Sequence, residues 1–116
     1  MPTLELVPVI QATACCAPLT REVLAPDAAD DLARSLKALA DPARLRILSM
    51  VSAHENAEAC VCDLTEPLGL SQPTVSHHLK VLVEAGFLTR SKRATWAYYA
   101  LVPGALQSVA EFLTSP

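Results

Sequence analysis

The sequence lacks any hydrophobic run long enough to cross a membrane. Its longest uninterrupted apolar stretch, Trp96–Val102, falls far short of the ~18 residues that a transmembrane helix needs. The N-terminus, Met1-Pro2-Thr3-Leu4-Glu5, also lacks the basic residues that begin a secretory signal peptide. These two absences predict a soluble protein of the cytoplasm, where thiols stay reduced. The four cysteines therefore point to metal or redox chemistry before structural disulfides.

Signatures of an enzyme are missing as well. A thiol oxidoreductase would show Cys-x-x-Cys beside a βαβ pattern, and neither occurs. A Cys–His hydrolase would need a third orienting group and an oxyanion site, and nothing in the sequence suggests a pocket large enough for a substrate. We therefore predict that the chain is not an enzyme and uses no organic cofactor.

The length and composition fit one folded domain. The chain has 116 residues, 52% of them apolar, and a net charge of −3, so it is too apolar and too weakly charged to be disordered throughout. At this size roughly two thirds of the surface of the unfolded chain can be buried without disulfides. Residues 1–27 contain four prolines and no sustained periodicity, which predicts an extended arm ahead of a domain formed by residues 28–116.

Positive charge is concentrated in one segment. Residues 69–101 hold four basic side chains against one acidic, a balance of +3, whereas residues 1–31 hold one basic and five acidic side chains. Salt largely screens exposed charges that lie more than ~10 Å apart. The basic segment can therefore bind an anion although the whole chain is acidic.

Hydrophobic periodicity predicts five helices, at about 28–40, 42–53, 61–68, 72–85 and 104–114. Asp41 before Pro42 is a helix N-cap, Gly69 suits a left-handed C-terminal position, and Ser71 can cap the next helix. Residues 54–58 form a polar connector. The apolar stripes expected to be buried are Leu32, Leu36, Leu39 and Ala40; Leu45, Leu48, Val51 and Ser52; Val75, Leu79, Leu82 and Val83; and Leu106, Val109, Ala110 and Leu113.

A β-hairpin is predicted between the last two helices. Residues 87–90 and 95–101 have β character, the loop 91–94 joins them, and Trp96, Tyr98 and Tyr99 are expected in the hairpin core. The resulting order, α-α-α-α-β-β-α, is that of a mainly α winged helix-turn-helix with a β-hairpin wing. The first and last helices lie outside the helix-turn-helix, and their apolar stripes are candidate surfaces for a homodimer.

The helix at 72–85 is the candidate DNA-reading element. Its exposed side carries hydrogen-bonding and basic residues, as recognition of base edges in a major groove requires, although an ordinary solvated helix face has a similar composition. The basic wing that follows favours DNA, because such wings contact phosphates. The predicted DNA-binding residues are Gln72, Thr74, Ser76, His77, His78, Lys80, Arg90, Lys92 and Arg93.

The cysteines form two close pairs, Cys15-Cys16 and Cys60-Val61-Cys62. Disulfides between such close neighbours are disfavoured, because bridged Cα atoms usually lie ~5–6 Å apart with aligned Cβ vectors. Paired thiolates aimed at one soft ion fit this spacing better, and the alternative is that the cysteines are merely buried or incidental. In a regular helix Cys60 and Cys62 would point about 200° apart. They can therefore serve one ion only if Cys60 lies in a non-helical entry.

Four segments together resemble the ArsR/SmtB family of metal-sensing winged-helix repressors over about residues 28–113. They are Asp41-Pro42-Ala43-Arg44-Leu45-Arg46-Ile47-Leu48, Cys60-Val61-Cys62-Asp63-Leu64, Ser71–Leu82 and Ala85-Gly86-Phe87-Leu88. The Cys-Val-Cys-Asp-Leu string is similar to the thiolate site of the arsenite-responsive and the cadmium/lead-responsive branches. Residues 102–116 contain no His or Asp for the last-helix site that zinc and nickel or cobalt sensors use. The resemblance therefore favours a soft metal or metalloid.

The resemblance also implies a metal-ligand set and a function. Some arsenite repressors have a third cysteine where this chain has Thr65, so Cys15 and Cys16 would complete a site with Cys60 and Cys62. The expected protein is a homodimeric repressor that binds operator DNA when metal-free and releases it when As(III) binds. Three alternatives stay open: a Cd(II)- or Pb(II)-responsive repressor with four thiolates, a thiol-based redox sensor, and a metal carrier. The metal carrier would leave the face of helix 72–85 and the basic wing unexplained.

Overall fold

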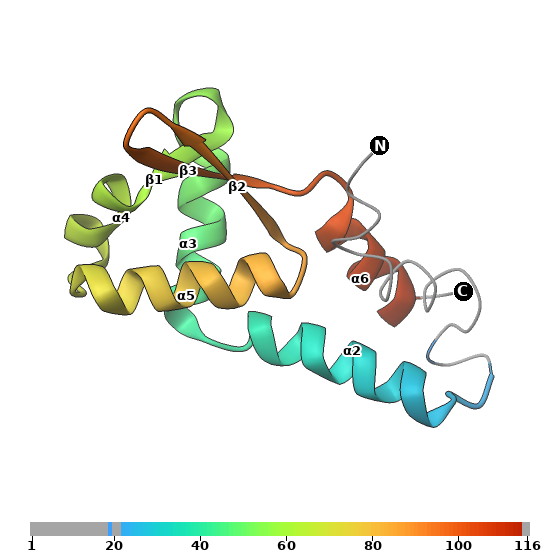
Figure 1. The fold of residues 1–116 in the computed structure, drawn as a ribbon. Helices are drawn as coiled ribbons and strands as arrows, with labels where there is room; N and C mark the ends of the chain where they lie inside the picture. Colours follow the sequence, from blue (N-terminus) through green and yellow to red (C-terminus); the bar gives the residue numbers. More distant parts are fainter. Residues whose placement is uncertain (1–18, 20–21, 115–116) are drawn as a thin grey trace.

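The structure is a computed structural model that describes residues 19 and 22–114. It confirms the winged helix-turn-helix (Figure 1). The elements, in chain order, are α2 (Pro26–Leu39), α3 (Pro42–Ala53), the 3-10 helix η2 (Glu55–Ala57), β1 (Glu58–Cys60), α4 (Val61–Leu68), α5 (Gln72–Glu84), β2 (Leu88–Arg93), β3 (Trp96–Leu101) and α6 (Ala105–Leu113). Most of the predicted arm 1–27 lies outside the described residues, and helix α2 begins at Pro26.

The helix-turn-helix forms where the capping residues predict it. Asp41 caps α3 by accepting hydrogen bonds from the backbone N–H groups of Ala43 (2.8 Å) and Arg44 (3.2 Å). Gly69 ends α4 in the left-handed conformation, with φ 70°. Ser71 then caps α5 by accepting from the N–H of Thr74 at 3.3 Å. These local bonds set the turn that brings α5 across α4.

The sheet has one strand more than the sequence predicts. Its order is β1-β3-β2, with all pairs antiparallel, and Glu58, Ala59 and Cys60 pair with Ala100, Tyr99 and Tyr98. The prediction of a polar connector over 54–58 was therefore wrong at its end. A strand of three residues has too few positions to show alternation, and β1 forms because β3 offers it a partner.

The hairpin turn is tighter than predicted. Strand β2 continues to Arg93 and β3 begins at Trp96, so the turn consists of Ala94 and Thr95 instead of the loop 91–94. Ala94 takes a left-handed conformation, φ 56°, which turns of two residues require. Trp96 at this turn is 55% exposed, which contradicts its predicted place in the hairpin core, whereas Tyr99 is buried as predicted.

The buried faces of the helices match the predictions best in α5. Val75, Leu79 and Leu82 are fully buried there. In α3 and α6 the predicted stripes were partly wrong, because Ile47, Ala105 and Phe112 are buried instead of five predicted residues. The exposed five are Leu45, Ser52, Leu106, Ala110 and Leu113. In α2 the prediction was also partly wrong, since the core takes Leu32, Ser35 and Ala38. Leu36 and Leu39 are half-buried and Ala40 is exposed.

Helix α5 runs through the middle of the molecule, with α4 and the hairpin toward one end and α6 toward the other (Figure 1). Within the described part of the chain, no helix is both long and apolar enough to span a membrane. The fold thus places the Cys60-Val61-Cys62 segment where β1 passes into α4, one helix ahead of α5.

Candidate functional site

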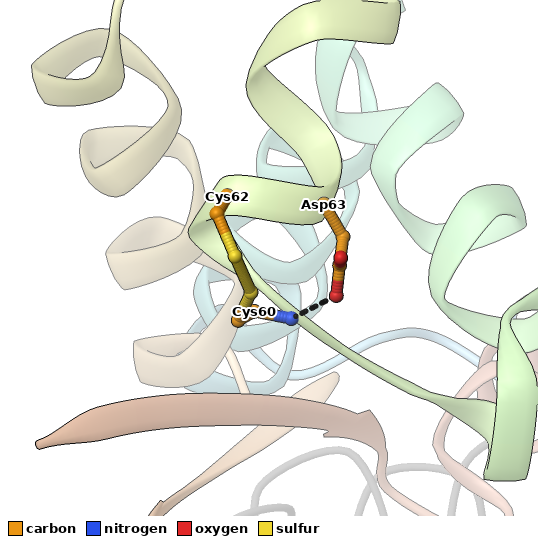
Figure 2. Close-up of side chains that lie close together, drawn as sticks. All are labelled: Cys60, Cys62 and Asp63. Atoms are coloured by element: carbon orange, nitrogen blue, oxygen red, sulfur yellow. Dashed lines mark hydrogen bonds between the residues drawn. A yellow bond between two sulfur atoms is a disulfide. The ribbon is translucent and has the colours of Figure 1, made fainter.

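The junction of β1 and α4 brings the two cysteines of the segment together. Cys60 is extended (φ −97°, ψ 171°) and serves as the N-cap of α4, whereas Cys62 lies in its first turn. This is the non-helical entry that the sequence argument required for a shared ion. In the structure the two sulfurs are joined as a disulfide, with Cα atoms 5.3 Å apart (Figure 2). The expectation that a disulfide is disfavoured between such close neighbours was wrong. The extended backbone at Cys60 separates the two Cα atoms by a distance that a disulfide can span.

Asp63 and His54 complete this cluster, and the sequence analysis gave neither a role. The Asp63 carboxylate accepts a hydrogen bond from the backbone N–H of Cys60 at 3.0 Å (Figure 2). His54 Nε2, at the end of α3, lies 3.3 Å from the same carboxylate oxygen. The sequence offered one signal for the role of Asp63, an acidic residue at the third position of helix α4. It is easily missed, because the usual capping box begins with Ser or Thr and this one begins with Cys.

The donor set of the cluster suits a soft ion. The ligand atoms of Cys60, Cys62 and Asp63 lie within 4.8 Å of one another. Cys60 is buried (5% exposed), whereas Cys62 is exposed. Two sulfurs from one protomer, one of them reachable from solvent, fit a thiophilic metal or metalloid once both are reduced to thiols. Cys15 and Cys16, the other predicted ligands, lie outside the described residues.

Helix α5 presents most of its predicted reading residues to solvent. Gln72, Thr74, His77 and Lys80 are exposed, and Ser76 is half-buried. Thr74 Oγ1 also accepts a hydrogen bond from the Ser71 hydroxyl at 2.9 Å. The exposed side of α5 thus carries hydrogen-bond donors and acceptors, which can pair with base edges, and the cation of Lys80, which can pair with a phosphate.

His78 occupies a different environment from His77. It is half-buried, and its Nδ1 lies 3.1 Å from Nη1 of Arg44. Because a guanidinium can only donate, Nδ1 of His78 is the acceptor in this pair. The same guanidinium donates to the carbonyls of Ala38 (2.7 Å) and Lys37 (3.3 Å). His78 therefore lies in the joint between α2, α3 and α5, away from the exposed readers.

The three wing cations are not equivalent. Arg90, Lys92 and Arg93 are all exposed, but only Arg93 has an ion-pair partner among the described residues. Arg93 donates two hydrogen bonds to Glu58, at 2.8 and 2.6 Å, and its guanidinium carbon lies 4.6 Å from the centre of the Tyr98 ring. These hydrogen bonds favour the charged form of both partners. They lower the pKa of Glu58 below its ordinary value and raise the pKa of Arg93.

One cleft joins the thiol segment to the reading face. It has a volume of about 260 Å³ and lies between α4, α5 and the hairpin. Cys60, Gln72, Ser76 and Arg90 all line it, so one buried cysteine and three predicted DNA contacts share one space.

Comparisons with known proteins match this arrangement. Residues 41–90 match the family described as "Bacterial regulatory protein, arsR family". An uncharacterized HTH-type transcriptional regulator of Methanocaldococcus jannaschii is 39% identical over 77 residues, which cover 66% of this chain and 84% of that protein. An arsenical resistance operon repressor of Staphylococcus aureus is 39% identical over 83 residues, with 72% and 77% covered.

The arsenical resistance operon repressor of Bacillus subtilis is 43% identical over 68 residues, or 59% of this chain. The match spans 63% of that repressor, less than two thirds of its length.

Solved structures agree with the family. The AntR antimony-specific transcriptional repressor has a TM-score of 0.64 and 25% identity, with 79% of this chain and 82% of that chain covered. A homodimeric winged helix-turn-helix domain from Mycobacterium bovis has a TM-score of 0.63 and 26% identity, with 78% and 84% covered. Reduced HlyU from Vibrio cholerae has a TM-score of 0.59 and 30% identity, with 74% and 85% covered.

The family consists of DNA-binding transcriptional regulators, which confirms the prediction that the chain is not an enzyme. The capped helix-turn-helix, the hairpin wing and the matched sequence agree, and the chain belongs to the ArsR family of bacterial regulatory proteins.

Proposed function

We propose that the protein is a homodimeric repressor that binds its operator when metal-free and releases it when As(III) binds its cysteine thiolates. The observation that carries the proposal is the β1–α4 junction, which brings the sulfurs of Cys60 and Cys62 together one helix ahead of the reading helix. Relatives named arsenical resistance operon repressors, at 39% and 43% identity, support As(III) as the inducer.

Cys60 and Cys62, once reduced, would supply two thiolates. A site for As(III) with three thiolates would need one more sulfur, which Cys15 or Cys16 of either protomer would supply. The Asp63 carboxylate accepts a hydrogen bond from the backbone N–H of Cys60. This bond would fix the backbone of Cys60 and keep its buried sulfur close to the sulfur of Cys62. A ligand that joins Cys60 to the N-terminal arm would pull on the start of α4, and α4 leads through Gly69 into α5.

DNA binding would use the exposed face of α5 and the wing. Gln72, Thr74, Ser76 and His77 would contact bases, while Lys80, Arg90 and Lys92 would contact phosphates. His78 and Arg93, also predicted from the sequence, are held by Arg44 and Glu58 in the structure. They would contact DNA directly only after leaving those partners.

Two copies would associate through their terminal helices. Leu106 and Leu113 are exposed on α6, at 41% and 38%, although leucine favours burial. The related Mycobacterium bovis domain is homodimeric. A second copy covering α6 would bury these leucines and present two α5 helices to two operator half-sites.

The test is fluorescence anisotropy of the reduced full chain on duplex DNA from upstream of its own gene, titrated with arsenite. Release at near-stoichiometric arsenite is expected, and a hundredfold loss of affinity corresponds to a coupling of about 3 kcal/mol. Replacing both Cys60 and Cys62 by Ser should keep DNA binding and abolish release, because Ser also caps helices. Loss of DNA binding in that variant would make the pair structural.

A parallel titration with cadmium or lead separates the inducers. Release by either ion at lower concentration than arsenite would favour the Cd(II)/Pb(II) alternative, in which Cys15, Cys16, Cys60 and Cys62 form a four-thiolate site. The Cys15→Ser/Cys16→Ser variant tests the arm in either case. Unchanged release by that variant would remove the arm from the site.

The Cys60–Cys62 disulfide favours one further candidate, a redox-sensing regulator. In that function the two thiols form the S–S bond and give up two protons and two electrons. Hydrogen peroxide accepts them, its O–O bond breaks, and two water molecules leave. Peroxide would then release operator DNA without metal, dithiothreitol would restore binding, and Cys62→Ser alone would abolish the response. DNA binding that ignores both arsenite and peroxide would refute both candidates.

A further inference from the structure

A bridge between charged side chains connects the wing tip to the strand that ends in Cys60. The two terminal guanidinium nitrogens of Arg93 each donate to one carboxylate oxygen of Glu58, at 2.8 and 2.6 Å, and the two residues lie 35 positions apart in the sequence. The Glu58 side chain is only 19% exposed, and the guanidinium lies over the Tyr98 ring. Such bidentate ion pairs fix the orientation of the two side chains as well as their distance, because the guanidinium and the carboxylate are both planar.

The sheet explains why this bridge matters for the tip. In the order β1-β3-β2, Glu58 and Arg93 lie on the two outer strands, so the bridge passes across β3. Backbone pairing between β1 and β3 covers Tyr98 to Ala100 only. The tip, where Arg93 pairs with Trp96, lies beyond that ladder. Among the described hydrogen bonds and ion pairs, the bridge is the one that ties the tip to β1.

The other end of β1 is the thiol site. Glu58 starts this strand of three residues and Cys60 ends it, with its N–H held by Asp63. A ligand that draws the Cys60 sulfur toward the arm must shift the backbone at Cys60. Because β1 is so short, Glu58 shifts with it, and the planar pair carries the shift to Arg93.

We propose that the Glu58–Arg93 bridge transmits the state of the thiol pair to the wing, so that Arg93 is a positioning residue of the sensor and not a phosphate contact. The inference rests on the proposed function, because it needs a ligand or oxidant that acts at Cys60 and Cys62. It adds a second route to the one through α4, and it acts on the exposed Arg90 and Lys92.

The experiment measures operator affinity of the full chain with and without arsenite, over a range of salt, and takes the ratio of the two dissociation constants. Glu58→Gln and Arg93→Gln should each reduce that ratio by about tenfold, because either change breaks the bridge. The charge-swapped Glu58→Arg/Arg93→Glu variant should recover most of the ratio. Lys92→Gln is the matched control, since it removes a neighbouring wing cation: it should weaken binding and lower the salt slope by about one unit per protomer, with the ratio unchanged.

Glu58→Gln is the sharpest variant because the two possible roles of Arg93 predict opposite results. If Arg93 binds phosphate, freeing it from Glu58 tightens operator binding and leaves the ratio intact, which would overturn the proposal. An Arg93→Gln variant that behaves like Lys92→Gln would also overturn it. If the wild-type protein is not released by arsenite, cadmium or peroxide, the proposed function fails and the bridge proposal with it. If the wild type is released and both bridge variants keep the wild-type ratio, the bridge proposal alone fails.

Discussion

Lys80→Gln tests whether the exposed side of α5 faces DNA phosphates. Lys80 is exposed on this helix, and each phosphate contact contributes about 0.9 to the slope of log affinity against log salt concentration. A dimer carries two copies, so the variant should lower the slope by about 1.8. Between 50 and 200 mM salt, a fourfold change, the wild type should therefore lose about 12-fold more affinity than the variant.

The matched control is Lys37→Gln, which removes the same charge from the exposed end of α2. Lys37 lines a pocket with Val81 and Glu84 at the C-terminal end of α5 and is not among the predicted DNA contacts, so its removal should leave the slope unchanged. Anisotropy titrations on one operator duplex at four salt concentrations give the three slopes. A Lys80→Gln slope equal to that of the wild type would refute the proposed orientation of α5. Equal reductions in both variants would show that net charge, not contact, sets the slope.

Three further predictions concern base reading and stability. Gln72→Ala should change base preference more than overall affinity, because Gln72 is exposed at the start of α5 and an amide can pair with base edges. An unchanged preference in a binding-site selection would remove it from the proposed base contacts. Leu64→Ala should cost about 3 kcal/mol of unfolding free energy by urea titration, since Leu64 is 1% exposed, whereas Leu45→Ala, at 53% exposed, should cost less than about 1. Asp41→Asn should lower Tm at pH 7, and the difference should shrink as the pH falls below 3.8. The hydrogen bonds from Arg44 and Ala43 lower the pKa of Asp41, so its contribution is present above the unfolded pKa and is lost as pH falls through the folded value.

The helix-turn-helix was predictable because its signals are local. Asp41, Gly69 and Ser71 each act within four residues of their own position, and their capping roles are seen in the structure. The buried side of α5 was also predictable, because Val75, Leu79 and Leu82 repeat at helical spacing and meet the core. Local bonds and periodicity therefore account for the part of the fold that carries the reading face.

Elements that depend on distant partners were not predictable in the same way. Strand β1 exists because β3 lies beside it, and its three residues show no pattern of their own. In α6 two apolar sides compete, and the core took Val109 and Phe112 while Leu106 and Leu113 stayed exposed. A single sequence shows that both sides are apolar but not which one the rest of the protomer covers.

In the candidate site, too, local features were predictable and contacts with distant residues were not. The proximity of Cys60 to Cys62 could be inferred from their spacing, given a non-helical entry, and Cys60 has the required extended conformation, but the disulfide between them was not predicted. The roles of His54 and Glu58 could not be inferred, because each depends on a partner brought by the fold: Asp63 across a helix junction, and Arg93 across β3. Charge counting gave three equivalent wing cations, whereas the fold separates Arg93 from the other two.

The conformation of Cys60 links the proposed sensor site to the proposed DNA-binding elements. The residue must be extended to pair with Tyr98, to cap α4 and to approach Cys62, so one backbone conformation serves three contacts. A ligand that alters it therefore disturbs the sheet and α4 together. The sheet leads to the wing and α4 leads to α5, which are the two DNA-facing elements of the proposed repressor. A small change at one residue can thus reach both surfaces without any long chain of intermediates.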